Sequence, residues 1–564
     1  MKSTRAAPPS DPPQSGARLT RLDGLLIASL VILAFLVAVV HLATPAMKIF
    51  DEVYFALAGE EYLKHIPPWE WTHPMFTKEI IALSIILFGD NAFGWRCLNV
   101  VVGALEVAVI YAFAKRLTAS TAFAATAGLL LVFDGFHFTE SRIATGEITI
   151  STLILTSLYA FYRYWDSVQS RVERLVANRF GRAFWLTLAG GVVFAVAFSF
   201  VANIQPASHS PKEQFARDIY NSGGAEPASY IIAFLYALLG VYLFARIVLP
   251  RWLPQRGARL SYADGSSVLI KTYPGIDRTA TLWLTALVVS LGLLASSKWN
   301  GAFDFAIVIA VVTLVWATRF LHGRPPLGNP NGFPLDIVFG LMFFVAATIY
   351  AITYLPLFLL GHGHSLNDVV TLQHIMYAYH SSVGGTHPYM SVWWQWPIMQ
   401  IPVDFYWQDF RTAAAAAIPT GCCVAMIMAL PNPVVFLLGL VSVPFVGWLA
   451  WRERNRGFAL LVIAYFLQWL PWVHSPRMLF EYHFFPNLAI IVLCDVILLQ
   501  RFCGPLTTLG ARLSLAAYVA AVVVTFAFFY PVLAGVPLPY NQWNARMLPD
   551  VWHVPHTSWI MPPR

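Results

Sequence analysis

The sequence predicts an all-α polytopic membrane protein. Hydrophobic residues make up 58% of its 564 residues, charged residues make up only 12%, and the mean hydropathy is +0.62. Apolar runs of about twenty residues, the length that crosses a bilayer core of about 30 Å, recur from one end of the chain to the other. Together these observations exclude a soluble globular protein.

Hydropathy predicts about 11–13 transmembrane helices, with some latitude because boundaries drawn from a single sequence are loose. The first span, residues 24–45, follows a polar, Pro-rich and basic N-terminus. Its apolar stretch is too long for the h-region of a cleaved signal peptide, so it reads as a signal anchor. The remaining predicted spans are 97–114, 121–138, 143–162, 184–203, 229–249, 280–297, 300–318, 334–360, 432–451, 457–473, 482–500 and 514–534.

The distribution of Lys and Arg predicts the orientation. With a cytoplasmic N-terminus, the loops assigned to the inside carry 24 of the 36 Lys and Arg residues, although the outer loops are longer. This is the positive-inside bias, and it places loops 46–96 and 361–431 outside the membrane. It also explains the net charge of +7 without a nucleic-acid partner.

The predicted spans divide the chain into five parts. Residues 1–23 form a disordered cytoplasmic N-terminus, and residues 24–360 a first transmembrane module whose outer loop is 46–96. An outer loop rich in His and Trp (361–431), a second transmembrane module (432–534) and an extracytoplasmic tail (535–564) follow. Because long loops in compact proteins tend to carry function, we expect the chemistry on the outer side.

The first candidate site lies just after the first span. Asp51 and Glu52 are adjacent carboxylates, and His73-Pro74 and Lys78 follow about twenty residues later. Residues 51–64 have the pattern of an amphipathic helix lying in the interface. A partly dehydrated carboxylate there gains basicity and suits the removal of a proton from a hydroxyl. The alternative is a solvated loop or an interfacial helix with ordinary charges.

A second polar group interrupts the apolar pattern at Asp134 to Arg142 and continues to Glu147. Ionisable residues at membrane depth are energetically costly, so their presence predicts a functional site. The planar donor fork of Arg142 matches a phosphate group. The alternative is a structural ion pair between Arg142 and either Asp134 or Glu147.

Two further groups complete the candidates. Lys298, in a Ser-Lys-Trp-Asn-Gly turn, is either a snorkelling anchor or part of a site. The outer loop with His387 and Trp396 faces a segment containing Arg477, Tyr482 and His483. The histidine spacings leave a metal site open, but no HExxH motif or Cys-based ligand set supports one.

In this order, the motifs resemble the protein O-mannosyltransferase family, the dolichyl- or polyprenyl-phosphate-mannose–protein mannosyltransferases of the GT-C membrane fold (glycosyltransferase family 39). Members carry Asp-Glu in the first outer loop, then His-Pro-x-x-Gly-Lys, then an Asp before Ser-Arg and a further acidic residue. A Ser/Thr-Lys-Trp-x-Gly turn, a His-Pro-Tyr…Trp-x-Trp-Pro loop and an Arg…Phe-x-Tyr-His-x-x-Pro segment follow. All appear here between about residues 50 and 490. No outer loop is large enough for the MIR domain of eukaryotic members, so the resemblance is to the bacterial branch.

The resemblance implies roles for individual residues. Asp51 would be the catalytic base, with Glu52 beside it organising the site. Arg142, with His73 and Lys78, would hold the lipid-linked phosphate.

Lys298 joins this donor-binding set. Glu147 stands where relatives usually have Asp, and Thr77, in the turn that presents Lys78, stands where they usually have Gly. The supporting residues implied are Asp134, Glu147, His387, Trp396, Arg477, Tyr482 and His483.

The implied reaction transfers mannose, with inversion, from a polyprenyl-phosphate-linked donor to Ser or Thr hydroxyls of secreted or membrane proteins, including chains emerging from the Sec translocon. The expected location is the bacterial cytoplasmic membrane, with the active site outside. No cofactor is assigned, and a divalent Mg or Mn ion stays open. Two alternatives remain: a GT-C transferase acting on lipid A, a lipoglycan or a cell-wall glycan, and a membrane transporter, although no internal repeat or broken midplane helix is evident.

Overall fold

The computed structural model describes residues 18–65, 70–169, 227–245, 258–261, 267–270, 278–321, 335–356, 366–382, 384–410, 423–475 and 477–547. The predicted span 184–203 lies outside these residues. Every other predicted span overlaps a described helix. These helices are α1 (Arg21–Val39), α4 (Ala92–Thr118), α5 (Thr121–Val132), α7 (Glu147–Gln169), α10 (Pro227–Leu243), α12 (Arg278–Ala295), α13 (Ala302–Leu321), α14 (Leu335–Thr353), α17 (Pro433–Glu453), α18 (Arg456–Trp469), α19 (Asn487–Cys503) and α20 (Leu509–Ala534).

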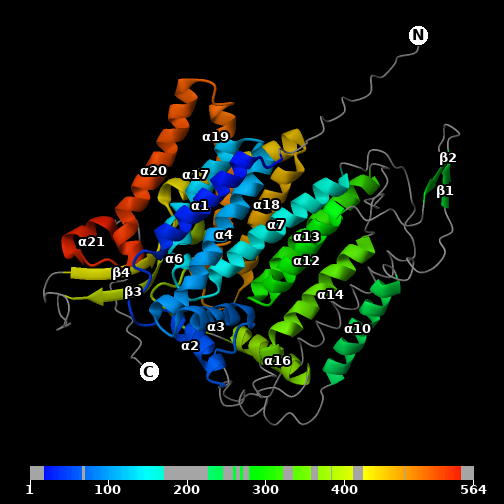
Figure 1. Ribbon diagram of the computed structural model, residues 1–564, viewed down its shortest axis with the longest axis horizontal. Helices are drawn as coiled ribbons and strands as arrows, with labels where there is room; N and C mark the ends of the chain where they lie inside the picture. Colours follow the sequence, from blue (N-terminus) through cyan, green and yellow to red (C-terminus); the bar gives the residue numbers. More distant parts are fainter. Residues whose placement is uncertain are drawn as a thin grey trace.

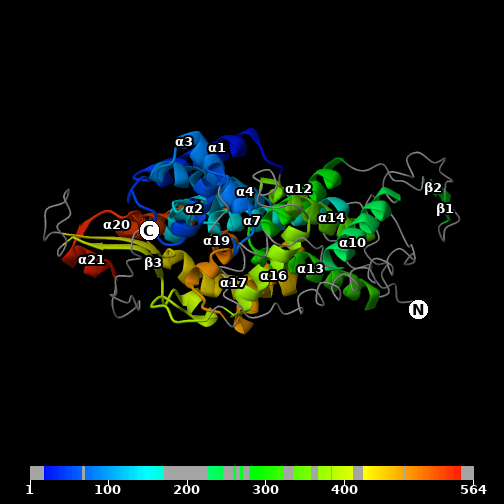
Figure 2. The same cartoon turned by 90° about the horizontal axis from the view of Figure 1, so that it is seen from below.

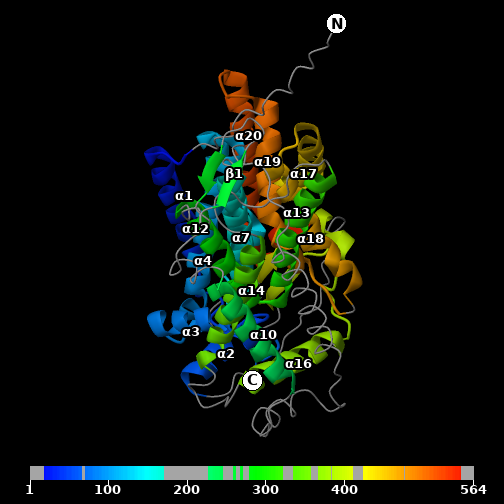
Figure 3. The same ribbon diagram turned by 90° about the vertical axis from the view of Figure 1, so that its right-hand side faces the viewer.

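Within the described residues, five helical segments are long and apolar enough to cross a membrane by themselves: α1, α4, α17, residues Arg456–His474 and α20. The long helices run in roughly the same direction (Figure 3). Helix α4 packs against α1, α5 and α7, and α19 packs against α4, α5 and α17. Seen from below, α4, α7 and α19 therefore lie between α1 on one side and α17 on the other (Figure 2).

Polar residues fix the ends of several of these helices. Asn91 accepts hydrogen bonds from the backbone N–H groups of Phe93 and Gly94, which begins α4, and Asn455 begins α18 in the same way. At α1, Thr20 and Asp23 form a capping box. Asp23 is fully buried and also pairs with Lys115 of α4 at 3.1 Å, so the same carboxylate ties two helices together.

The predicted span 121–138 is not one straight helix. It is divided into α5 and α6 (Gly135–Ser141), which meet at an angle of 61°. The break lies at Asp134, whose side chain caps α6 by accepting from the N–H groups of Phe136 and His137. A Cβ at Gly135 would lie 2.4 Å from the Leu430 carbonyl oxygen, so only glycine permits this close approach.

The predicted outer loops contain their own structure. Loop 46–96 forms α2 (Glu52–Leu63) and α3 (Phe76–Phe88). Loop 361–431 contains α16 (Leu366–Ser382), the 3₁₀ turn η4 (Trp393–Ile398) and the antiparallel hairpin of β3 (Val403–Asp409) and β4 (Cys423–Ala429). The predicted tail adds β5 (Leu538–Pro539), in the sheet order β3-β4-β5, and α21 (Tyr540–Met547). A second hairpin joins β1 (Ala258–Ser261) to β2 (Ser267–Ile270).

Helices α2, α3 and α16 gather at one end of the helix bundle (Figures 1 and 3). Three short 3₁₀ turns connect the long helices: η3 (Trp299–Gly301), η5 (Leu470–His474) and η6 (Glu481–Phe484). The backbone N–H of Phe76, at the start of α3, donates to the Ser296 carbonyl just before η3. The first outer loop is thereby joined to the turn between α12 and α13, where the candidate site lies.

Candidate active site

Asp51 lies at the N-terminus of α2, but its side chain makes no capping hydrogen bond. The preceding residue, Phe50, has a left-handed backbone (φ 46°), and its ring stacks on Phe405 of β3 with centroids 4.6 Å apart. The carboxylate of Asp51 is half-buried and interacts electrostatically with four charged side chains: Lys298, Glu147, Glu70 and Arg477. Burial raises the pKa of Asp51 to about 6, and the Lys298 ammonium opposes that rise. Asp51 is therefore a carboxylate of raised basicity without a hydrogen-bond partner among the described residues.

Glu52 has a different environment from its neighbour. Its two oxygens accept a bidentate pair of hydrogen bonds from Arg96, both 2.7 Å long, and two more from the backbone N–H groups of Ile49 and Ala144. Both side chains of the ion pair are buried. Because its lone pairs are used in this way, Glu52 is placed to hold the loop before α2 and not to take part in bond making.

Lys78, expected to bind phosphate, is fully buried. Its ammonium donates hydrogen bonds to the Glu70 carbonyl (2.6 Å) and the His73 carbonyl (2.7 Å), and it forms an ion pair with the Glu70 carboxylate (2.6 Å). Glu70 also accepts from Thr72 N–H at 2.9 Å and lies 3.0 Å from His73 Nδ1. We call Glu70, Thr72, His73 and Lys78 the Glu70 cluster. In this arrangement the Lys78 ammonium is engaged within the Glu70 cluster, and its role in holding the donor phosphate stays a prediction.

His73 is held as a neutral ring in the Glu70 cluster. Burial lowers the pKa of His73 below its ordinary value, against the pull of Glu70. Burial alone would raise the pKa of Glu70, but Lys78 and His73 together hold it well below its usual range. With Nδ1–H directed at the Glu70 carboxylate, His73 keeps a lone pair on Nε2, which suits a hydroxyl better than a phosphate.

Arg142, the other expected phosphate ligand, makes its contacts with Phe138 of α6 and with the end of α1. Its guanidinium donates to the carbonyls of Ala38, Val40 and His41 at the end of α1, and lies 4.8 Å from the Phe138 ring centre. It forms an ion pair with neither Asp134 nor Glu147. The structure therefore does not bring Arg142 together with His73 and Lys78, and gives it the role of tying α6 to α1.

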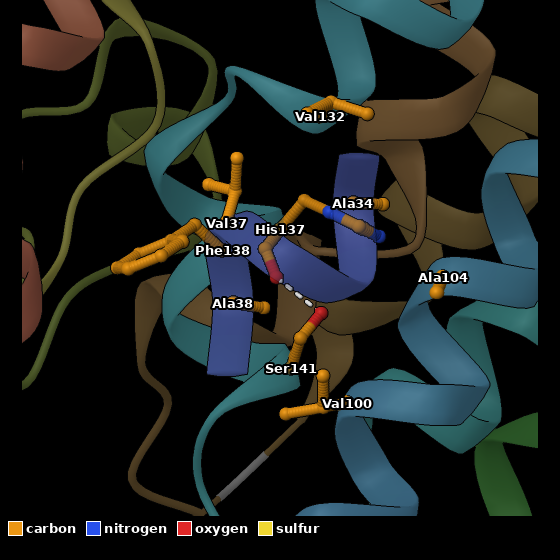
Figure 4. Close-up of a pocket in the computed structure, with 9 residues that line it drawn as sticks. All are labelled: Ala34, Val37, Ala38, Val100, Ala104, Val132, His137, Phe138 and Ser141. Carbon is orange, nitrogen blue, oxygen red and sulfur yellow. Dashed lines mark hydrogen bonds between the residues drawn. The ribbon is translucent and has the colours of Figure 1, made fainter. Parts of the chain in front are cut away.

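A small cavity lies between residues of α1, α4, α5 and α6, and Asp51 does not line it (Figure 4). Its polar groups are already bonded within the protein: Ser141 Oγ donates to the His137 carbonyl at 2.6 Å, and His137 Nε2 lies 3.2 Å from the Gly103 carbonyl. The cavity is otherwise apolar, so it is a gap in the packing between α1 and helices α4, α5 and α6. Its lining residues are Ala34, Val37, Ala38, Val100, Ala104, Val132, His137, Phe138 and Ser141.

Lys298 does reach the site. It forms an ion pair with Glu147, at the start of α7, and lies 5.7 Å from the ring centre of Tyr482. Glu140 of α6 is also buried in this neighbourhood, where the charges of Glu147, Lys298 and Asp51 act on it. Oε1 of Glu140 and Oε2 of Glu147 are buried without hydrogen-bond partners in the described part of the chain.

Aromatic side chains cover one side of the site. Trp396 is fully buried, and its indole Nε1–H donates a hydrogen bond to Ser391 Oγ at 2.9 Å. Its ring stacks on the His483 ring, with the ring centroids 6.2 Å apart. His483 in turn stacks on Tyr482 at 4.6 Å, and His387 meets Phe480 edge-on. The predicted aromatic loop and the segment after η5 are thus brought together.

Arg477 supplies the second cation near Asp51. One guanidinium N–H donates to His380 Nδ1 of α16 at 2.7 Å, and His380 Nε2 lies 2.7 Å from the Thr72 carbonyl. Arg477 Nε is buried and has no hydrogen-bond partner among the described residues.

The structure thus gathers Asp51, Glu147, Lys298, Arg477, Tyr482 and His483. The side chains of Glu52, Lys78, Asp134 and Arg142 bond to other parts of the protein, and their predicted roles in the site stay predictions. No role is predicted from the sequence for Glu70, Arg96, Glu140 or His380. A carboxylate three residues before His73 was a usable signal for Glu70, but the pairing of Glu52 with Arg96 spans 44 residues and had none. The described residues contain no group of three or more His, Cys, Asp or Glu side chains arranged to hold a metal ion.

Comparison with known proteins decides the family. Residues 87–200 match the family model of dolichyl-phosphate-mannose-protein mannosyltransferase, and residues 365–552 match the C-terminal four-transmembrane region of protein O-mannosyltransferase. Together the two models cover more than half of the chain. The chain belongs to the protein O-mannosyltransferase family.

Relatives of similar length support this membership. A polyprenol-phosphate-mannose–protein mannosyltransferase of Mycolicibacterium smegmatis (strain MKD8) is 25% identical over 96% of both chains. One from Mycobacterium tuberculosis (strain H37Rv) is 24% identical over 95% of this chain and 93% of its own. The Saccharomyces cerevisiae Pmt1-Pmt2 complex, solved with its sugar donor, has a chain that matches with a TM-score of 0.62 at 11% identity, covering 95% of this chain and 93% of its own.

These findings confirm the predicted family, the helical GT-C fold and the classification as a mannosyltransferase. Membership of a transferase family contradicts the transporter alternative.

Proposed function

We propose that this mannosyltransferase transfers mannose from a polyprenyl-phosphate-linked donor to Ser or Thr hydroxyls of proteins, with Asp51 as the base. The observation that carries the assignment of the base is the environment of Asp51. Its carboxylate has no hydrogen-bond partner among the described residues, its pKa is raised to about 6, and Lys298 and Arg477 lie within electrostatic reach.

The proposed reaction is a direct displacement. The hydroxyl oxygen of Ser or Thr attacks C1 of mannose, and the new C–O bond forms as the bond from C1 to the phosphate oxygen breaks. The bonding electrons leave with the polyprenyl phosphate, the configuration at C1 inverts, and Asp51 takes the hydroxyl proton. A positioned base of this kind contributes roughly 10²- to 10⁴-fold in rate.

The cationic side of the site would receive the leaving group. Negative charge grows on the phosphate as the glycosidic bond breaks, and Lys298 and Arg477 would stabilise that charge. Lys298 forms an ion pair with Glu147, so the positive charge of Lys298 is partly offset before the donor binds. The donor tail would lie in the bilayer against the apolar helices, which explains why the functional charges lie at the end of the helix bundle.

The proposal includes a location, which the distribution of Lys and Arg supports. We assign the protein to the bacterial cytoplasmic membrane, with the N-terminus inside and the end containing α2, α3 and α16 outside. Acceptor proteins would meet this end as unfolded segments, including chains leaving the Sec translocon.

A transfer assay tests the proposal. Membranes containing the full chain are incubated with polyprenyl-phosphate-[³H]mannose and a Ser/Thr-rich peptide, and label in the peptide is counted. We expect label in the peptide and release of polyprenyl phosphate. A matched peptide with Ala at every Ser and Thr should take up none. Transfer only to lipid A, a lipoglycan or a cell-wall glycan would contradict the protein acceptor and favour the other GT-C activity.

A further inference from the structure

We infer that His380 is a positioning residue that presents Arg477, with its charge uncompensated, to the phosphate of the donor. The inference rests on the proposed function for the identity of the ligand. Its basis is the chain of contacts from the Thr72 carbonyl through His380 to Arg477.

The two contacts of His380 determine which ring nitrogen carries the proton. A carbonyl oxygen can only accept, so Nε2, at 2.7 Å from the Thr72 carbonyl, is the N–H. A guanidinium can only donate, so Nδ1, at 2.7 Å from Arg477, carries the lone pair. The ring is therefore neutral. Burial, reinforced by His73 and Arg477, lowers the pKa of His380 to about 3, which keeps it neutral at physiological pH.

A neutral acceptor fixes a cation in place without cancelling its charge. Lys78 and Lys298 differ from Arg477 in this respect, because Lys78 is paired with Glu70 and Lys298 with Glu147. No described carboxylate lies within ion-pair distance of Arg477, and its Nε is buried without a partner in that part of the chain. A guanidinium with unused donors matches the oxygens of a phosphate and is costly to bury without an anion. Arg477 is thus the cation near Asp51 that is prepared for an anionic ligand.

The same contacts join this anchor to the base. Thr72 belongs to the Glu70 cluster, where its N–H donates to Glu70 at 2.9 Å, and the His73 and His380 rings meet edge-on at 5.3 Å. The Glu70 cluster precedes α3, which packs against α2, and Asp51 immediately precedes α2. The loop that contains the Glu70 cluster therefore contacts His380 directly and leads into the helix that packs against α2, next to Asp51.

Substitutions of His380 that differ only in charge test the inference. Gln at 380 keeps a neutral acceptor and a donor, whereas Glu has the same shape and forms an ion pair with Arg477. The full chain is purified in lipid nanodiscs, and two quantities are measured: the Kd for polyprenyl phosphate without sugar, and the KM and kcat for the mannosyl donor. Thermal unfolding midpoints show whether each variant is folded.

We expect His380→Gln to stay within about threefold of the wild type, and His380→Glu to raise the Kd and the donor KM by about tenfold or more, as for the loss of a charge-assisted hydrogen bond. The kcat should change less than the KM. Ser381→Glu, which adds the same charge on the exposed neighbouring position, should behave as the wild type. Wild-type donor binding in His380→Glu would overturn the inference, and so would equal losses in His380→Gln and His380→Glu or a matching loss in Ser381→Glu.

The binding arm separates this inference from the proposed function. Binding of polyprenyl phosphate that depends on the charge at residue 380, without mannose transfer to any peptide, would support the inference and contradict the proposed function. Mannose transfer to the peptide, with donor binding that does not depend on the charge at residue 380, would support the proposed function and contradict the inference.

Discussion

Adjacent carboxylates take opposite roles in this protein because their surroundings differ. Glu52 accepts four hydrogen bonds and is fixed against Arg96, whereas Asp51 has none among the described residues and stays half-buried. A saturated carboxylate is a poor base, and a partly dehydrated one is a better base. The sequence indicated the pair, and the contacts distinguish its members.

The pH dependence of transfer follows from the environment of Asp51. Burial raises its pKa from 3.8 to about 6, so the carboxylate, which is the form that accepts a proton, is present above that pH and lost below it. We expect kcat/KM for transfer to be half-maximal near pH 6 and to fall about tenfold for each further pH unit. A pH–rate profile with constant activity down to pH 4.5 would contradict a base with this pKa.

The buried ion pair of Glu52 and Arg96 should dominate local stability. Glu52→Gln leaves Arg96 buried and unpaired, and we expect it to lower the free energy of unfolding by about 3–5 kcal/mol. The exposed pair of Arg501 and Glu453 supplies a matched control, since Glu453→Gln should cost at most about 1 kcal/mol. Unfolding of both variants in detergent, followed by circular dichroism, measures the difference. Equal losses would contradict the structural role of Glu52.

The contacts of the individual site residues were only partly predictable from the sequence. Asp51, Lys298 and Arg477 carry charge that the membrane boundary makes conspicuous, and the structure gathers them. The contacts of Lys78 and Arg142 were not predictable, because both side chains bind backbone carbonyls that carry no sequence signature. A cation in a motif identifies a site without showing whether the charge is already used.

At the scale of elements, hydropathy located the long helices well. Each predicted span within the described residues overlaps a helix, because the bilayer sets both its length and its composition. The break between α5 and α6 was missed, although it lies at Asp134, where polar residues interrupt the apolar pattern. The β3–β4 hairpin was missed too, because its pairing joins segments on either side of a long connection.

The break at Asp134 yields a graded prediction. Its side chain both caps α6 and accepts from the Asn432 N–H at the start of α17, at 2.9 Å. Asp134→Asn keeps an acceptor for the cap, whereas Asp134→Ala removes both contacts. We expect Asp134→Asn to lower the unfolding midpoint slightly. Asp134→Ala should lower the midpoint more, because the lost cap and the unpaired N–H reduce the free energy of unfolding by about 2–4 kcal/mol. Equal midpoints for Asn and Ala would show that the α6 cap contributes nothing.

At the scale of the whole molecule, the outer surface of the helix bundle is suited to lipid. Large hydrophobic side chains stay exposed on α1, α17 and α20, among them Leu25 (68% exposed) and Val524 (67% exposed). A surface of this kind would aggregate in water and is stable against acyl chains. The charged site lies at one end of these helices, where a lipid-linked donor and a polar acceptor can meet.

Orientation is checked by labelling introduced cysteines with a membrane-impermeant maleimide. Lys64→Cys lies on the exposed end of α2, and Glu453→Cys on the exposed end of α17, beside the basic residues expected inside. After subtracting the labelling of the parent chain, we expect Lys64→Cys to react in intact cells and Glu453→Cys to react only after permeabilisation. The reverse pattern would place Asp51 on the cytoplasmic side.

The most direct test of the account compares Asp51→Asn with the wild type in a single turnover of donor-loaded enzyme with a Ser/Thr peptide, with polyprenyl-phosphate binding measured in parallel. If Asp51 is the base, transfer falls by roughly 10²- to 10⁴-fold while polyprenyl phosphate still binds. Transfer at the wild-type rate in Asp51→Asn would contradict the account and require the proton to go to another group.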